Sequence, residues 1–353
     1  MFGLYTVEIL VISSLLLAWH TNTQKSIKQN QKILCGLLLL GILVFIATLR
    51  DGSINPDHKA YLQLIFFPQS HKGDIEESFF IINSFVKFCG GSFHYVFFIY
   101  ALIAIGIKTY AIFKYSVNIF FSICVWLSFS FILHDLIQIR AAISAGCLLL
   151  MIPYVYKKKY LEAIIIWIIA FFFHNSSIIF GLLFLLKRDT FRPFIWIIAY
   201  LIIFIVNVFD LPIFTYIVKL ISILPGFLSD RIGIWNPTVL DGLSRMKIYS
   251  RYALIPSLFC ILAIFYRNKS SLYFPETILC LKICFIGIFI FGIGLPIVSE
   301  RIFELLSVSY IFLVPTSLYW FKHNSELKGK IITIIFCLFM SWNLLFKQEV
   351  FSN

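Results

Sequence analysis

The chain has 353 residues, of which 60% are hydrophobic, 18% aromatic and only 13% charged, and its mean hydropathy is +0.93. A soluble domain cannot hide that much apolar surface, and a β-barrel would show short alternating segments instead of long continuous apolar runs, so the composition indicates a helical membrane protein. The formal net charge is +12, but the basic residues lie in short loops between apolar runs, which is the positive-inside pattern and excludes nucleic acid as a partner.

Apolar runs follow one another along the whole chain. Because a membrane crossing needs about 20 apolar residues, they predict about twelve crossings. The expected fold is an all-α, polytopic integral-membrane helical bundle that forms a single domain over residues 1–353. The runs are Leu4–Trp19, Ile33–Leu49, Phe93–Phe113, Ile119–Leu133, Leu136–Tyr154, Tyr160–Phe173, Ser176–Leu186, Pro193–Phe209, Tyr249–Tyr266, Pro275–Leu295, Ile302–Phe321 and Lys330–Phe346.

Some crossings are expected to be short or broken. The runs on either side of His134 and of His174 are short for full spans. Irregular backbone at membrane depth normally lines a cavity inside the protein. We therefore expect broken or re-entrant helices at these two histidines.

Lysine and arginine predict the orientation of the bundle. They gather in alternate short loops, such as Lys157–Lys159, so these loops are expected to be cytoplasmic and both termini to face outward. Two longer segments, 50–92 and 210–248, then lie outside. The first contains Ile75–Phe88, which we expect to form an interfacial helix, and the second contains the apolar piece Ile213–Leu224, which we expect in or dipping into the membrane.

The first outer segment opens on an unusually polar stretch, Leu49–Tyr61. Arg50, Asp57 and Tyr61 belong to it, together with His58 and Lys59. In so apolar a chain, this stretch is expected at the membrane surface, where water and a polar substrate can reach it. The alternative is a hydrophilic loop that only joins two helices.

Further polar groups interrupt apolar runs on the same predicted side. Arg140 follows His134, Asp135 and Gln138 at the start of one crossing. A buried arginine is costly unless paired, so Arg140 either forms an ion pair, for example with Asp135, or binds phosphate with its planar fork. His174 is either a hydrogen-bonded core residue or a group that accepts a proton from a sugar hydroxyl.

Three arginines near later outer ends extend this set, namely Arg231, Arg251 and Arg301. The alternative for Arg301 is an ion pair with Glu300 or Glu304. Together with Arg50 and Arg140, these arginines predict a positive cavity that suits a lipid-linked pyrophosphate.

Other chemistries have weaker support. The eight cysteines are expected as small core residues without a metal or redox role. The sequence has no Walker loop, Gly-rich dinucleotide turn, HExxH or CxxC pair. We expect no cofactor, and no metal where arginines neutralise the leaving group; an aspartate-bound divalent ion is the alternative.

Four short segments, in order along the chain, resemble the EpsG family. The segment from Arg50 through Asp57 to Tyr61 resembles the family's Arg-x-x-x-Gly-x-Asp-x-x-x-Tyr region, with one extra residue before the aspartate. Gln138–Ile143 resembles its Arg-Gln-x-hydrophobic-Ala element, although Ala141 stands where a glutamine is expected. Phe173–Ser176 resembles its Phe-His-x-Ser element, and Ser299–Ile302 its Ser-x-Arg segment.

The resemblance implies a polysaccharide-repeat polymerase of the Wzy type, an enzyme of O-antigen, capsule or exopolysaccharide assembly. Such a glycosyltransferase acts at the outer face of the bacterial inner membrane on undecaprenyl-pyrophosphate-linked oligosaccharide. A membrane protein that regulates chain length is a candidate partner. On this hypothesis Arg140 and Arg301 bind the donor pyrophosphate, and Asp57 or His174 takes the proton from the acceptor hydroxyl.

The remaining candidate residues, Arg50, Tyr61, Arg231 and Arg251, support the pyrophosphate or glycan. Two other classes stay open. A flippase or transporter of lipid-linked oligosaccharide would also bury charges in many helices, but more of them in mid-helix. A membrane acyltransferase would require a histidine at a helix end where the acyl donor enters.

Overall fold

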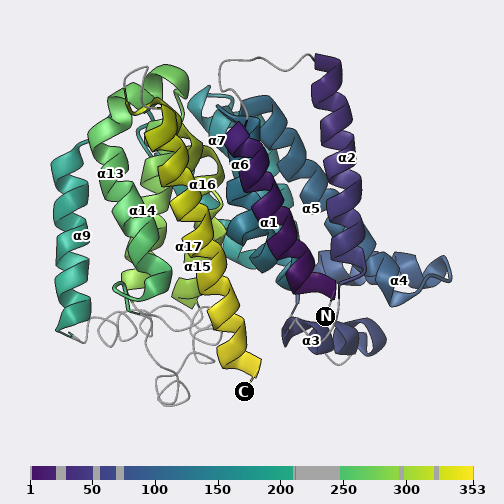
Figure 1. Ribbon diagram of the computed structural model, residues 1–353. Helices are drawn as coiled ribbons and strands as arrows, with labels where there is room; N and C mark the ends of the chain where they lie inside the picture. Colours follow the sequence, from purple (N-terminus) through teal and green to yellow (C-terminus); the bar gives the residue numbers. More distant parts are fainter. Residues whose placement is uncertain are drawn as a thin grey trace.

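The computed structural model is an all-α helical bundle (Figure 1). It describes residues 2–20, 29–50, 56–68, 75–209, 211, 247–293, 298–321 and 326–352. The second outer segment, including Ile213–Leu224, Arg231 and Arg245, therefore lies almost wholly outside the described residues.

Each predicted apolar run coincides with one or more helices in the part of the chain that the structure describes. The helices along the bundle are α1 (Phe2–His20), α2 (Gln29–Thr48), α5 (Phe93–Tyr115), α6 (Ile119–Val125), η2 (Trp126–Ile137), α7 (Ile139–Tyr156), α8 (Tyr160–Phe173), η3 (Asn175–Leu185), α9 (Pro193–Val208), α13 (Arg251–Tyr273), α14 (Thr277–Ile293), α15 (Val298–Ser307), α16 (Tyr310–Leu313), η4 (Val314–Tyr319) and α17 (Glu326–Ser352).

Among the residues that the structure describes, five helical stretches are long and apolar enough to cross a membrane, and several other apolar helices are shorter. The five are 93–115, 119–137, 139–156, 298–319 and 326–344. The chain is therefore an integral membrane protein, while the expected total of about twelve crossings stays a prediction.

Two short helices lie across one end of the bundle, α3 (Pro56–Phe66) and α4 (Glu77–Phe88) (Figure 1). We call this the α3 end and the opposite end the lysine-rich end. Helix α4 covers most of Ile75–Phe88, the segment predicted to be an interfacial helix. The second half of the polar stretch Leu49–Tyr61 is not a loop but the beginning of helix α3. Helix α4 stops at Gly90, whose φ of +68° is left-handed, a conformation that glycine adopts at little cost.

The predicted helix break at His174 is confirmed, and the one predicted at His134 lies four residues later, at Gln138. The π-helical turns of η2 end at Gln138, whose φ and ψ of −98° and 67° leave the helical region before α7 begins. His174 is extended, with φ −157° and ψ 115°, between α8 and the 3₁₀ helix η3. Arg140, just after the first break, and His174, at the second, both contact Glu76 at the α3 end.

The core of the bundle is built mainly by α5, α7, α14 and α15 with their neighbours. Because lipid tails are as apolar as leucine, close packing holds these helices together. The prediction that all eight cysteines are core residues is wrong for Cys35 and Cys89, which are exposed. Cys35 lies in α2 at the edge of the bundle, and Cys89 directly follows the end of α4.

Candidate active site

A cluster of charged and polar side chains occupies the α3 end of the bundle. We call it the rim cluster. It comprises Arg50, Asp57, Tyr61, Glu76, Arg140, His174 and Arg301. Arg50 follows the end of α2, Asp57 and Tyr61 belong to α3, and Glu76 precedes α4. Arg140 lies in the first turn of α7, His174 follows α8, and Arg301 belongs to α15.

Glu76 is the hub of the rim cluster. Its carboxylate accepts hydrogen bonds from the Arg140 guanidinium, from His174 Nδ1 at 3.1 Å and from the Asn175 backbone N–H at 3.1 Å. Glu76 sits at the N-cap of α4 but does not cap that helix with its side chain. The carboxylate instead joins three segments that are distant in sequence.

The charges around Glu76 keep it ionised. Burial alone would raise the pKa of this carboxyl, but the hydrogen bond from His174 and the charge of Arg140 outweigh burial and lower the pKa from 4.5 to about 2. Glu76 is therefore a carboxylate at every physiological pH. It also fixes the histidine tautomer, because Nδ1–H donates to Glu76 and leaves Nε2 as the acceptor.

The position of His174 is set by its own backbone. Its N–H donates to Ala170 O at 2.9 Å and closes α8, while its carbonyl accepts from the Ser177 hydroxyl at 2.7 Å. Trp167 Nε1 in turn donates to Ser177 O at 2.9 Å. The imidazole is thus held on a rigid turn, which suits a group that transfers a proton.

Arg50 is a buried guanidinium with spare donors. Its side chain lies over the Phe97 ring, with the guanidinium carbon 4.0 Å from the ring centre. Nε and Nη2 are buried and have no hydrogen-bond partner among the described residues. Burial lowers its pKa to about 10, partly offset by Tyr61 and Asp57. Such donors are costly to leave unsatisfied, so an anionic ligand would stabilise this arginine.

Asp57 lies in the field of several charged groups. Burial raises the pKa of its carboxyl, while Arg301, Arg140 and Arg50 lower it. Burial also raises the pKa of the Tyr61 hydroxyl, and Arg140 lowers it; the Arg140 guanidinium carbon is 5.9 Å from the Tyr61 ring centre. The three arginines and Asp57 therefore share one site.

Glu304 forms a second arm behind the rim cluster. It accepts hydrogen bonds from Gln138 Nε2 at 2.9 Å and from the Tyr252 hydroxyl at 3.0 Å. Its backbone carbonyl lies 3.2 Å from His134 Nε2. This arm ties the break before α7 to α13 and α15.

The suggested ion pair between Asp135 and Arg140 is wrong. Asp135 instead pairs with Lys108 Nζ at 2.7 Å and accepts from Trp126 Nε1 at 3.0 Å, while Arg140 pairs with Glu76. Asp135 precedes the helix break and points into the bundle, whereas Arg140 follows the break and reaches the rim, so the two side chains serve different partners.

Six of the eight predicted site residues come together in the rim cluster, namely Arg50, Asp57, Tyr61, Arg140, His174 and Arg301. Arg301 is exposed at the start of α15. Arg251 begins α13, but its side chain lies outside the described residues, as does all of Arg231.

Sequence reasoning missed the roles of Glu76, Glu304, Tyr252 and Lys108. A signal existed for Lys108, which is an ionisable residue deep inside the apolar run of α5 and thus implies a buried partner. Glu76 stands where a polar segment meets an amphipathic helix, but nothing local distinguishes it from Glu77 beside it.

The arrangement suits chemistry on an anionic, hydroxyl-bearing substrate. Guanidinium groups stabilise charge that develops on a phosphate, and a histidine with one nitrogen held by a carboxylate can take a proton through the other. No group of three or more metal-ligating side chains occurs among the residues that the structure describes.

Fold and site together define a polytopic, all-helical membrane protein with an arginine-rich polar site at one end of its helices. Its identity follows from comparison with known families. The chain belongs to the EpsG family, whose model matches residues 33–352. EpsG is a family of Wzy-like polymerases, which implies polysaccharide biosynthesis from a lipid-linked oligosaccharide. No curated protein matches, and no solved structure matches.

Proposed function

We propose that the protein joins undecaprenyl-pyrophosphate-linked repeat units into an O-antigen, capsule or exopolysaccharide chain at the outer face of the bacterial inner membrane. The observation that carries this proposal is the meeting of Arg50, Arg140 and Arg301 around Asp57, beside the hydrogen-bonded pair of Glu76 and His174. The family supports polymerisation, and the rim cluster supports the particular substrate class.

The arginines are proposed to hold the donor pyrophosphate. Arg50 offers two buried donors without partners among the described residues, and Arg301 is exposed at the mouth of the site. Arg140 is only partly exposed and shares Glu76 with His174. Their combined charge offsets the negative charge that forms on undecaprenyl pyrophosphate as it leaves.

His174 is proposed to act as the general base. The acceptor hydroxyl attacks the anomeric carbon of the donor sugar, the bond between that carbon and the pyrophosphate oxygen breaks, and the hydroxyl proton passes to His174 Nε2. Glu76, 3.1 Å from Nδ1, stabilises the imidazolium that results. Asp57 is the second candidate for the base, since burial raises its pKa.

The test is complementation of a strain from which the gene is deleted. Wild-type protein should restore the ladder of long surface polysaccharide, and Arg140→Ala should leave only single-repeat product. Arg267→Ala is the matched control, because Arg267 lies near the other end of α13 and donates to Ile264 O. A normal ladder with Arg140→Ala, at equal protein level, would overturn the assignment.

One observation favours the alternative of a flippase for lipid-linked oligosaccharide. The pair of Lys108 and Asp135 is completely buried between helices, as mid-membrane charges of transporters often are. The same gel separates the two functions, because loss of translocation removes every glycan that matures outside, including the single-repeat product.

A further inference from the structure

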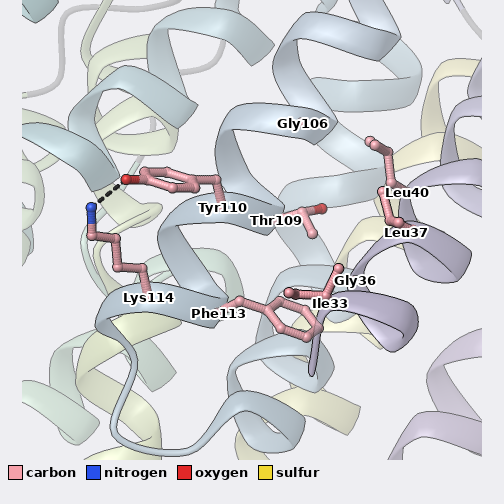
Figure 2. A pocket seen from close by; sticks show the side chains of 9 residues that line it. All are labelled: Ile33, Gly36, Leu37, Leu40, Gly106, Thr109, Tyr110, Phe113 and Lys114. Carbon is pink, nitrogen blue, oxygen red and sulfur yellow. Dashed lines mark hydrogen bonds between the residues drawn. The ribbon is translucent and has the colours of Figure 1, made fainter. Parts of the chain in front are cut away.

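A groove between α2 and α5 opens on the side of the bundle, toward the lysine-rich end (Figure 2). It holds about 640 Å³, which lies within the range of small-molecule sites. Neighbouring apolar side chains of α2 are exposed, with Ile33 at 54% and Leu37 at 60%. The groove therefore faces the lipid of the bilayer rather than the inside of the protein.

The inner part of the groove is apolar, and glycines leave it open because they have no side chain. Gly36 and Gly106 line it from the two helices, next to Leu40 and Phe113. A side-chain carbon added at Gly106 would have only Leu40 Cδ1 nearby, at 4.0 Å. This leaves open space of the shape that an acyl chain fills.

A buried hydroxyl faces this space without a partner. Thr109 is only 8% exposed, and its Oγ1 has no hydrogen-bond partner among the described residues. Figure 2 shows the side chain between the two helices, pointing into the groove. Buried hydroxyls are normally satisfied, so Thr109 implies a ligand with a hydrogen-bond acceptor at this depth.

A positive charge marks the mouth of the groove. Lys114 lines it and donates to the Tyr110 hydroxyl, and its ammonium is 5.3 Å from the centre of the Tyr115 ring. Lys157 Nζ lies 5.4 Å from the same ring. Two cations therefore gather around one tyrosine, where the helices reach the bilayer surface, and this charge complements an anionic headgroup.

We infer that the groove binds one anionic phospholipid of the leaflet at the lysine-rich end. The phosphate contacts Lys114, the glycerol ester carbonyl accepts from the Thr109 hydroxyl, and one acyl chain runs over Gly36 and Gly106 toward Leu40. Lys114 lies five residues beyond Thr109, about 7.5 Å further along the axis, so the phosphate lies nearer the bilayer surface than the ester. This site is at the opposite end from the rim cluster and does not depend on the proposed function.

Native mass spectrometry of the full chain in detergent tests this inference, with phosphatidylglycerol and phosphatidylethanolamine as probes. Wild-type protein should bind one phosphatidylglycerol and prefer it about fivefold, the effect of one lysine at a membrane surface. Gly106→Leu, which fills the groove, should abolish binding. Gly41→Leu is the matched control, because nothing lies within 4 Å of a side-chain carbon added there.

Two further variants separate the parts of the site. Lys114→Ala should keep a lipid but lose the preference for phosphatidylglycerol, whereas Lys328→Ala, an exposed lysine at the start of α17, should change nothing. Thr109→Val should weaken both probes equally. The inference is overturned if wild type binds neither probe or retains a polyprenyl phosphate instead, if Lys114→Ala keeps its preference, or if Gly41→Leu loses as much lipid as Gly106→Leu.

Discussion

Two charged regions of the molecule, both built around the break before α7, differ in how completely their groups are satisfied. Lys108 and Asp135 are 0% exposed, and both carboxylate oxygens of Asp135 have a donor. In the rim cluster, Arg50 has buried donors without partners among the described residues, and Arg301 is exposed. The carboxylate of the first region has a donor on each oxygen, whereas the second region has guanidinium donors that can still bind a ligand.

The difference separates stability from function. A buried pair whose charges compensate each other has little to offer a ligand, but removing one partner leaves an uncompensated charge. A cluster with an excess of guanidinium donors is held together by the fold, and a bound anion would accept hydrogen bonds from the donors that have no partner. Mutations in the first region should therefore act through folding, whereas mutations in the second should damage activity, including where they also lower stability.

The largest effect is expected from His174→Ala in the rim cluster. Loss of a general base should lower the rate of chain extension about 10²- to 10⁴-fold in protein that is still folded. The measurement is the elongation rate of purified enzyme with a lipid-linked repeat unit. The matched control is His94→Ala, an exposed histidine of α5 at the same end. If Asp57→Asn abolishes elongation and His174→Ala does not, the base is Asp57.

Lys108→Met should show the opposite pattern. Leaving Asp135 buried without its cation should lower the free energy of unfolding by about 3–5 kcal/mol, measured by chemical unfolding in mixed micelles. The double variant Lys108→Met/Asp135→Leu should recover most of this loss, because it removes both charges. Equal stability of the single variant and the wild type would contradict the distinction between the two regions, and loss of activity without loss of stability would favour transport.

Glu76 should make the stability of the rim cluster depend on pH in the acid range. Because the folded state lowers the pKa of Glu76 from 4.5 to about 2, its contribution is fully present above pH 4.5 and is lost as pH falls toward 2. This contribution is on the order of 3 kcal/mol. Glu76→Gln should remove it.

The measurement for this prediction is thermal unfolding in detergent at several pH values. Glu162→Gln serves as the control, since Glu162 is 47% exposed and only 3.9 Å from Lys159, and such surface pairs contribute little. An acid transition of unchanged size in Glu76→Gln would assign the transition to another carboxyl.

The helices and the breaks could be predicted from the sequence, because both are local. Long apolar runs require helices in a bilayer, and polar residues at His134 and His174 interrupt those runs. The arginine-rich character of the site was also readable, since charge in an apolar chain is conspicuous.

The partners could not be predicted, because they depend on how distant helices pack. Glu76 is 64 residues from Arg140 and 98 residues from His174. Arg140 and Asp135 are neighbours in sequence, yet the helix break at Gln138 sends them to different regions. Proximity in sequence thus suggested the wrong pair, and only the assembled bundle reveals the right ones.

The smallest effect is expected from Tyr252→Phe, which tests the arm between the two regions. Glu304 is 1% exposed, like the closed pair, but it connects to the rim cluster through Gln138. Removing the 3.0 Å hydrogen bond from Tyr252 should cost about 2 kcal/mol of stability, typical for a bond to a charged group. Tyr249→Phe, at an exposed tyrosine nearby, is the matched control for the unfolding measurement.

Activity decides to which region the arm belongs. If Glu304 positions Arg140 relative to Arg301, Tyr252→Phe should also raise the Michaelis constant for the lipid-linked repeat unit. The two arginines would then bind the pyrophosphate more weakly, while the general base stays in place. If the arm only joins α13 to α15, stability alone should fall. The second result would limit the functional site to the groups around Glu76 and Asp57, and it would place Glu304 with Lys108 and Asp135 among the residues that hold the bundle together.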